Sequence, residues 1–288
     1  MCGIVGYVGA RSAHDVVIKG LKRLEYRGYD SAGIAVIEKG LKVTKCKGKV
    51  TQLESLIDKS AHATMGIGHT RWATHGEPND INSHPHTSTD GKIAVVHNGI
   101  IENYTALKVQ LQSQGHLFYS DTDTEIVAKL IQQFYNDPKV TSLEKAVQLA
   151  TKQINGTYGL AVIHEDIPEQ IVVARRGSPL LLGVGEHEMI IASDASAVAE
   201  YTDRVVYLDD NETAIIRHDG YEVMSNDFNP LEKQVHELQM SLEEIEKGGY
   251  PFFMLKEIFE QPKTIGDSLR GRILPDEGKI VLGGLSEV

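Results

Sequence analysis

The sequence predicts an α+β fold whose strands pair mainly antiparallel. Short apolar runs rich in β-branched residues fill the first two thirds of the chain, and stretches with helical periodicity separate only some of them. Between residues 157 and 223 one expected strand follows another across gaps of turn length. A parallel pair needs a crossover connection of a dozen or more residues, so these short gaps favour antiparallel pairing over a doubly wound parallel sheet.

The expected elements follow in order from these local patterns. Apolar runs bounded by turn residues predict strands at residues 4–8, 33–37, 65–69, 93–97, 160–164, 170–174, 180–184, 189–192 and 205–208. Apolar residues spaced three and four apart predict helices at residues 14–24, 104–114, 124–135, 142–154 and 196–201, the last of which is the shortest.

A change of composition near residue 225 predicts a domain boundary. Residues 225–230 are polar and end in an Asn-Pro pair, and the charged stretch 231–247 follows before Gly248-Gly249. Beyond that point the apolar residues are too few to close a second core. We therefore expect one domain over residues 2–225, and over residues 226–288 a linker and the truncated start of another. The alternative is a C-terminal helical appendage that folds onto the first domain.

Composition excludes several classes of function. The chain carries 29 Lys and Arg against 40 Asp and Glu, a net charge of −11, and this field repels nucleic acids and anionic lipid surfaces. No stretch approaches the roughly 20 uninterrupted apolar residues that span a bilayer, and the first basic residue is Arg11. Two cysteines exclude a disulfide scaffold. We expect a cytoplasmic protein with no nucleic-acid partner and no membrane partner.

Cys2 is the first residue with distinctive chemistry. Removal of Met1 would leave a thiol and a free α-amine on the same residue. The amine has a reference pKa of about 7.7 to 8, so about a tenth of it is unprotonated at pH 7 and can act as a general base. A nucleophile that carries its own base needs no histidine. Taken alone, Cys2 is equally a small apolar residue at the start of a strand.

Other segments support the chemical interpretation of Cys2. These segments are Met1–Gly6, Arg23–Gly33, His69–Gly76, Asn82–His86, His97–Asn103 and Ser120–Glu125. In this order they resemble the class II glutamine amidotransferases of the N-terminal nucleophile hydrolase superfamily, and the resemblance covers almost all of residues 2–225. It implies a four-layer αββα sandwich with two antiparallel sheets, and hydrolysis of glutamine by Cys2. The sequences of these motifs are most similar to those of the glutaminase domains of glutamine:fructose-6-phosphate aminotransferases. Residues 256–262 extend the similarity to the start of the sugar-phosphate isomerase (SIS) domain of these enzymes.

The resemblance assigns the groups that would hold glutamine. Arg71 would bind the α-carboxylate, because a planar guanidinium donates two parallel hydrogen bonds, with Thr74 and His75 nearby. Asp123 would pair with the α-ammonium, and its alternative role is the N-cap of the helix at residues 124–135. Trp72 would form part of a lid over the amino acid, or else pack in the core.

The resemblance also assigns the groups around the nucleophile. Asn98 and Gly99 would form an oxyanion hole from a side-chain amide and a backbone N–H. On pattern alone the same Asn-Gly pair predicts a turn between two strands. Arg27 and His84 are supporting candidates, Arg27 as a residue that orients the terminus near the nucleophile.

Other candidates carry less weight. The histidine-dense stretch of His69, His75, His84 and His86 lacks a carboxylate or thiol to complete a ligand set, so we expect no metal. Cys46 lies between two lysines that would lower its pKa, but a bystander thiol is the preferred interpretation. No phosphate-binding or dinucleotide-binding glycine motif occurs, so we expect no cofactor.

These observations predict an enzyme that hydrolyses L-glutamine to L-glutamate and ammonia through a thioester on Cys2. In the resembling aminotransferases the ammonia reaches fructose 6-phosphate and yields glucosamine 6-phosphate for amino-sugar biosynthesis, at an isomerase domain that we expect to be missing here. The first alternative is the glutaminase domain of another class II amidotransferase, against which residues 256–262 argue. The second is a non-catalytic regulatory module that binds glutamine, favoured if Met1 is retained. The oligomeric state, a homo-oligomer included, stays open.

Overall fold

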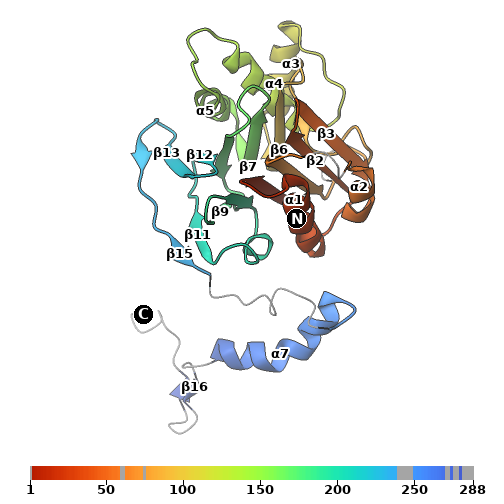
Figure 1. The fold of residues 1–288 in the computed structure, drawn as a ribbon, viewed down its shortest axis with the longest axis vertical. Helices are drawn as coiled ribbons and strands as arrows, with labels where there is room; N and C mark the ends of the chain where they lie inside the picture. Colours follow the sequence, from red (N-terminus) through yellow and green to blue (C-terminus); the bar gives the residue numbers. More distant parts are fainter. Residues whose placement is uncertain are drawn as a thin grey trace. The chain divides into compact units, whose positions relative to one another are not determined.

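Two antiparallel β-sheets dominate residues 1–239, the larger of the chain's two compact units; residues 240–288 form the other (Figure 1). The computed structural model describes residues 2–58, 62–73, 76–238, 249–269, 273–274 and 279–280.

The first sheet contains the amino-terminal strand at an interior position. Its strands are, in spatial order, β15 (His236–Glu237), β11 (Arg204–Tyr207), β9 (Leu181–Val184), β10 (Met189–Ala192), β1 (Gly3–Val8), β4 (Met65–Arg71), β2 (Ser31–Ile37) and β3 (Leu41–Lys47). Because β1 lies between β10 and β4, the residue that precedes it is held beside the end of β4.

The second sheet is built around a long antiparallel pair of strands, β6 and β7, which run side by side in Figure 1. Its strands are, in spatial order, β14 (Pro230–Leu231), β13 (Gly220–Ser225), β12 (Glu212–Arg217), β8 (Ile171–Arg176), β7 (Gly156–His164), β6 (Ile93–Ile101) and β5 (His86–Thr87).

Side-chain alternation along the strands produces a layered core. Ile4 and Val8 of β1 share one apolar cluster with Ala94 and Val96 of β6, and this cluster lies between the sheets. Val5 and Tyr7 of β1 point to the opposite face and pack with α1 (Ala13–Leu24) and α2 (Val50–Leu56). The outer face of β6 packs with α3 (Tyr104–Ser113), α4 (Thr124–Tyr135) and α5 (Leu143–Gln153). The expected α+β, four-layer αββα sandwich is confirmed.

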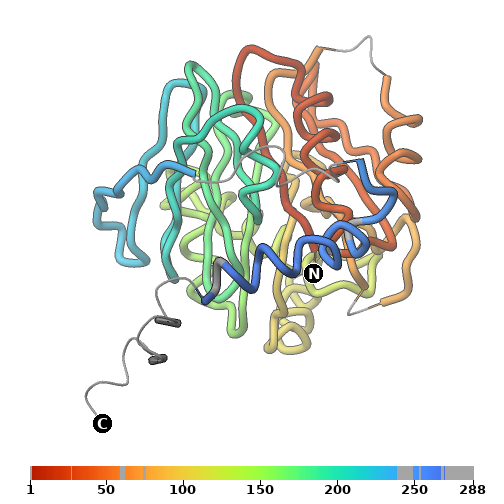
Figure 2. Tube along the Cα trace, turned by 90° about the horizontal axis from the view of Figure 1, so that it is seen from below, coloured from red at the N-terminus to blue at the C-terminus, as the bar shows by residue number. Residues whose placement is uncertain are grey.

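Most of the expected elements are present. All nine expected strands form, within a few residues at each end, and α1, α3, α4 and α5 match four of the expected helices. The fifth, at residues 196–201, was wrong in type: only a 3-10 turn, η2 (Ala195–Ala197), forms. Among the longer elements of this unit, the expectation missed α2, the strands β12 and β13 of the second sheet, and the partly exposed edge strand β3, whose lysines interrupt the apolar pattern. In Figure 2 the red and orange trace of the first 73 residues lies mainly on one side of this unit, and the green to cyan trace of residues 156–225 mainly on the other.

The described residues of the second unit form a long helix and a short hairpin. Helix α7 (Phe253–Leu269) contains Pro262, and β16 (Ile273–Leu274) pairs antiparallel with β17 (Lys279–Ile280). Residues 239–248 of the expected linker lie outside the described residues. Of the helices that the structure describes, none is both long enough and apolar enough to cross a membrane.

Candidate active site

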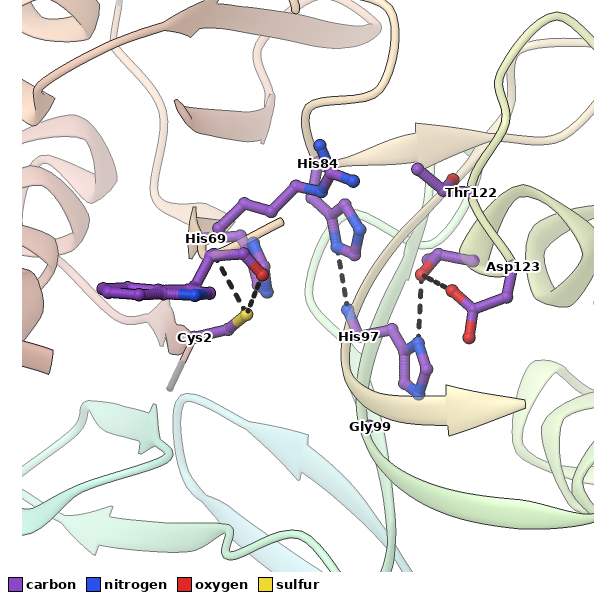
Figure 3. Close-up of a pocket in the computed structure, with 10 residues that line it drawn as sticks. Cys2, His69, His84, His97, Gly99, Thr122 and Asp123 are labelled. Atoms are coloured by element: carbon purple, nitrogen blue, oxygen red, sulfur yellow. Dashed lines mark hydrogen bonds between the residues drawn. The ribbon is translucent and has the colours of Figure 1, made fainter. Parts of the chain in front are cut away.

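The register between β1 and β4 places Cys2 at a pocket. Gly3 pairs with Thr70, so Cys2 lies beside the residues that end β4. A Cβ at Gly3 would lie 2.7 Å from Oγ1 of Thr70, so only glycine permits this approach. The backbone N–H of Trp72 donates to Sγ of Cys2 over 3.2 Å, and the thiol donates back to the Trp72 carbonyl over 3.6 Å (Figure 3).

The pocket brings together candidates from five separate segments. It is lined by Cys2, His69, Arg71, Trp72, His84, His97, Gly99, Thr122, Asp123 and Thr124. Thr74 and His75 lie outside the described residues, and Arg27 ends the 3-10 turn η1 (Glu25–Arg27), with its side chain likewise outside the description.

The environment of Cys2 keeps its thiol neutral at pH 7. Burial raises the pKa of the Cys2 thiol above its ordinary value of 9.0, and the hydrogen bond from Trp72 offsets this only in part. Many catalytic cysteines are instead activated by a lowered pKa. Reaction of this thiol with an amide therefore requires a base that removes its proton during the attack.

Arg71 presents a buried cation held by backbone carbonyls. It is the last residue of β4, and its guanidinium donates to the carbonyl of Gly76 over 3.1 Å and to that of Glu77 over 3.4 Å. Asn82 donates its side-chain amide to the same Glu77 carbonyl over 3.0 Å, which fixes the loop. A carboxylate is a stronger acceptor for guanidinium than a neutral carbonyl, so this site suits an anionic ligand group.

Asn98 and Gly99 lie in a continuous strand. Asn98 pairs with Gly159 and Gly99 with Tyr158 in the β6–β7 ladder, so the alternative of an Asn-Gly turn was wrong. Gly99 has a φ of 139°, and a Cβ there would lie 2.1 Å from the Thr157 carbonyl oxygen. Glycine is therefore required on the strand that borders the pocket.

Asp123 connects the start of α4 to the end of β6. It occupies the N-cap position of α4, but its side chain makes no capping hydrogen bond. Its Oδ2 instead accepts the backbone N–H of Ile101 over 2.8 Å. The carboxylate is buried and lines the pocket, where a cationic ligand group would offset the cost of its burial.

Trp72 lies at the rim of the pocket. The side chain is 54% exposed, so the core-packing alternative was wrong. A Cβ at Gly28, where φ is 98°, would lie 1.9 Å from the indole, which shows how closely the ring covers that backbone.

Four histidines, His69, His84, His86 and His97, form a buried cluster, and three of them belong to the histidine-dense stretch in which we expected no metal. The His69 and His84 rings stack with centroids 4.1 Å apart, His86 contacts His84 edge-on at 4.9 Å, and the His97 backbone N–H donates to Nδ1 of His84 over 3.4 Å. Burial lowers the pKa of all four imidazoles, that of His69 to about 3. Within the described ranges no group of three or more His, Cys, Asp and Glu residues could hold a metal ion.

Thr124 and His97 were missed as pocket residues. His97 Nδ1 lies 3.0 Å from Oγ1 of Thr124, and this pair joins β6 to α4 beside Asp123 (Figure 3). The only signal in the sequence was their position next to Asn98 and Asp123 in the two motifs.

Cys46 has the opposite electrostatic setting from an activated thiol. Burial and the nearby Asp80 carboxylate raise the pKa of the Cys46 thiol. The neighbouring Lys45 ammonium is directed elsewhere and donates to the carbonyls of Ile81 and Ser83. The Cys2 thiol has a raised pKa as well, so position distinguishes the two: Cys46 does not line the pocket that Cys2 lines, which agrees with its preferred interpretation as a bystander.

Comparison with known proteins identifies relatives of this chain. Residues 55–250 match the family described as the glutamine amidotransferase domain. The chain is 50% identical to a Chlorobaculum tepidum protein named glutamine–fructose-6-phosphate aminotransferase (isomerizing), over all of this chain and 47% of the relative. Bacteroides thetaiotaomicron has a protein of the same name that is 51% identical over 99% of this chain and 47% of the relative. The chain thus spans about half the length of the curated relatives it matches.

A solved structure supports the same relationship at the level of the fold. Glutamine phosphoribosylpyrophosphate amidotransferase from Bacillus subtilis, complexed with ADP and GMP, superposes with a TM-score of 0.67 at 27% identity. The match covers 80% of this chain and 50% of that one.

Proposed function

This chain belongs to the class II glutamine amidotransferase family, and we propose that it hydrolyses L-glutamine to L-glutamate and ammonia with Cys2 as the nucleophile. One observation carries the assignment of residues. A single pocket brings the Cys2 thiol together with a buried cation, Arg71, a buried anion, Asp123, and the glycine backbone at Gly99. These are the groups that an α-amino acid with a side-chain amide requires.

Cys2 and its own amine would perform the covalent chemistry. After removal of Met1, the α-amine of Cys2 takes the thiol proton as Sγ attacks the amide carbon of glutamine. The side-chain amide of Asn98 and the N–H of Gly99 donate to the oxyanion. The amine then gives the proton to the departing nitrogen, which leaves as ammonia. Water attacks the γ-glutamyl thioester, its proton returns through the amine, and glutamate is released with the free thiol.

The remaining pocket residues would bind the backbone of the substrate. Arg71 exchanges its carbonyl partners for the α-carboxylate of glutamine, and Asp123 pairs with the α-ammonium. That Thr74 and His75 assist Arg71 rests on the resemblance of the sequence motif alone. Trp72, half exposed at the rim, covers the bound amino acid. His84 would support this site by its stacking on His69, and Arg27 would orient the terminus near the nucleophile.

The longer enzymes to which the chain is similar suggest where the ammonia goes. Their name, glutamine–fructose-6-phosphate aminotransferase, supports the proposal that this chain is the ammonia-supplying half of such an enzyme, in amino-sugar biosynthesis. Residues 2–225 would be the glutaminase domain, and residues 226–288 a linker with the start of the sugar-phosphate isomerase domain. The first part of this linker would then lie against the glutaminase domain, because β14 and β15 pair with its sheets. A cytoplasmic location stays a prediction, and the oligomeric state, a homo-oligomer included, stays open.

Assays of the purified 288-residue chain test this function. We expect glutamate and ammonia from glutamine, and no glucosamine 6-phosphate when fructose 6-phosphate is added. Cys2→Ala should abolish hydrolysis, whereas Cys46→Ala, which removes a buried thiol elsewhere, should retain it. Absence of hydrolysis by a chain shown by mass spectrometry to have lost Met1 would contradict the proposal and favour a glutamine-binding module.

Limited proteolysis tests the domain assignment. A cut within residues 226–249 should leave an amino-terminal fragment that keeps the glutaminase rate of the whole chain. Loss of that rate on removal of the later residues would instead place them in the glutaminase fold.

A further inference from the structure

A buried hydrogen bond links the two sheets directly behind the nucleophile. His69 lies on β4 of the first sheet and Asn98 on β6 of the second. The Nε2 atom of His69 is 2.9 Å from Oδ1 of Asn98, and both side chains are buried. The other end of the same carboxamide, Nδ2 of Asn98, donates to the carbonyl oxygen of Cys2 over 3.3 Å.

These two contacts define which way the carboxamide of Asn98 faces. If the amide were rotated by 180°, Oδ1 would face the Cys2 carbonyl, and two acceptors would meet with no proton between them. In the orientation seen here, Oδ1 faces His69 and needs a donor. Only a protonated Nε2 supplies it.

Burial ensures that this proton is the only one on the ring. The pKa of His69 is lowered to about 3, chiefly by burial; the hydrogen bond to Asn98 opposes this shift only in part, and the charge of Arg71 adds to it. Between pH 5 and pH 9 the imidazole is therefore neutral and carries one proton. Placed on Nε2, that proton turns the ring into a fixed donor. The stacked ring of His84, with an interplanar angle of 20°, restrains the plane of His69.

We propose that His69 is a positioning residue for this reaction: its neutral Nε2–H form holds the Asn98 carboxamide with the NH2 group turned toward Cys2. This rests on the proposed function, in which that NH2 group donates to the oxyanion. Without the donor on Nε2, the Asn98 amide loses one of the two contacts that distinguish its ends and keeps only the longer one, to the Cys2 carbonyl. A carboxamide that samples both orientations presents an acceptor to the oxyanion for part of the time, which slows the chemical step and leaves glutamine binding unchanged.

A double-mutant cycle tests the proposal. His69→Leu should lower kcat by roughly 10- to 100-fold with KM changed less than about threefold, a part of the 10²- to 10³-fold loss that follows removal of an oxyanion donor. In the Asn98→Ala background the same substitution should change kcat less than about twofold, because its effect passes through Asn98. His69→Gln, which retains a donor, should recover most of the rate. His164→Leu, at an equally buried histidine outside the pocket, should leave kcat unchanged.

The proposal is overturned if His69→Leu retains the full kcat while Asn98→Ala loses it, or if the two losses multiply in the double variant. Nitrogen NMR of the histidine rings provides a readout that does not need activity. We expect the two ring nitrogens of His69 to have the chemical shifts of the Nε2–H tautomer throughout pH 5–8. Chemical shifts of the Nδ1–H tautomer would refute the assignment. If the unmodified chain hydrolyses no glutamine, the proposed function fails. The ring shifts then decide separately whether His69 is the donor to Asn98.

Discussion

The backbone N–H of Trp72 donates a hydrogen bond to the Sγ of Cys2 over 3.2 Å. Seventy residues separate the two in the chain, and the antiparallel register of Gly3 with Thr70 brings them together. A one-residue slip in that register would turn every side chain of β1 to the opposite face, so the packing of Ile4 and Val5 fixes the position of the nucleophile. The fold thereby delivers the second residue of the chain into a pocket that the rest of the motifs form.

Arg71→Lys should raise KM for glutamine more than the conserved charge suggests. The guanidinium now donates to two carbonyls, those of Gly76 and Glu77, and an ammonium cannot reproduce a two-pronged contact with the α-carboxylate that would replace them. We expect a rise in KM of roughly 10-fold or more, as for a lost charge-assisted hydrogen bond, with a smaller change in kcat. Steady-state kinetics decide. A selective loss of kcat would mean that Arg71 acts on the reacting atoms instead.

Gly99→Ala should destabilise the protein and abolish hydrolysis. The new Cβ would lie 2.1 Å from the Thr157 carbonyl oxygen, and the φ of 139° adds strain, so we expect a loss of more than about 3 kcal/mol in the free energy of unfolding. Gly91→Ala is the matched control: φ is 73°, no atom lies within 4 Å of the added Cβ, and the cost should be about 1 to 2 kcal/mol. Urea unfolding measures both. An equal loss in the free energy of unfolding for the two variants would show that the backbone of β6 shifts at Gly99 to accommodate the added methyl group.

The buried histidines should make the fold sensitive to acid. An imidazole whose pKa is lowered by folding binds its proton more tightly in the unfolded chain, so stability is lost as the pH falls below about 6.5. For His69 the loss continues to about pH 3. Each fully linked histidine contributes about 1.4 kcal/mol per pH unit. The free energy of unfolding, measured with urea between pH 7 and pH 4, should therefore fall less steeply with decreasing pH for His69→Gln than for the unmodified chain. Identical slopes would indicate that His69 is already protonated in the folded protein.

Local patterns predicted the α+β class and the antiparallel pairing because both follow from them, whereas the four layers were implied by the family resemblance. Runs such as Ile93–Val96 alternate between two apolar layers, and the short gaps after residue 157 leave no room for crossovers. The local pattern gave the wrong secondary structure where contacts between distant residues determine it. Strand β3 carries three lysines, and its pairing with β2 along its whole length defines it. Residues 196–201 have a helical pattern, but they form only a 3-10 turn and the turns after it.

The site was predictable only in part. Resemblance to a family identified Cys2, Arg71, Gly99 and Asp123, which the pocket does bring together. It did not reveal what the histidines do, because the roles of His69 and His84 depend on burial and on ring stacking, neither of which the sequence displays. The position of Gly99 inside a strand was likewise invisible, since an Asn-Gly pair usually turns the chain.

Covalent labelling of the chain tests the central claim most directly. A glutamine analogue that carries an electrophile on its side chain is incubated with the protein, which is then digested and analysed by mass spectrometry. We predict one added mass, on the peptide that begins at Cys2 after removal of Met1, with protection by excess glutamine and no label in the Cys2→Ala variant. Label on Cys46, or labelling that glutamine does not slow, would contradict the assignment of Cys2 as the glutamine-directed nucleophile.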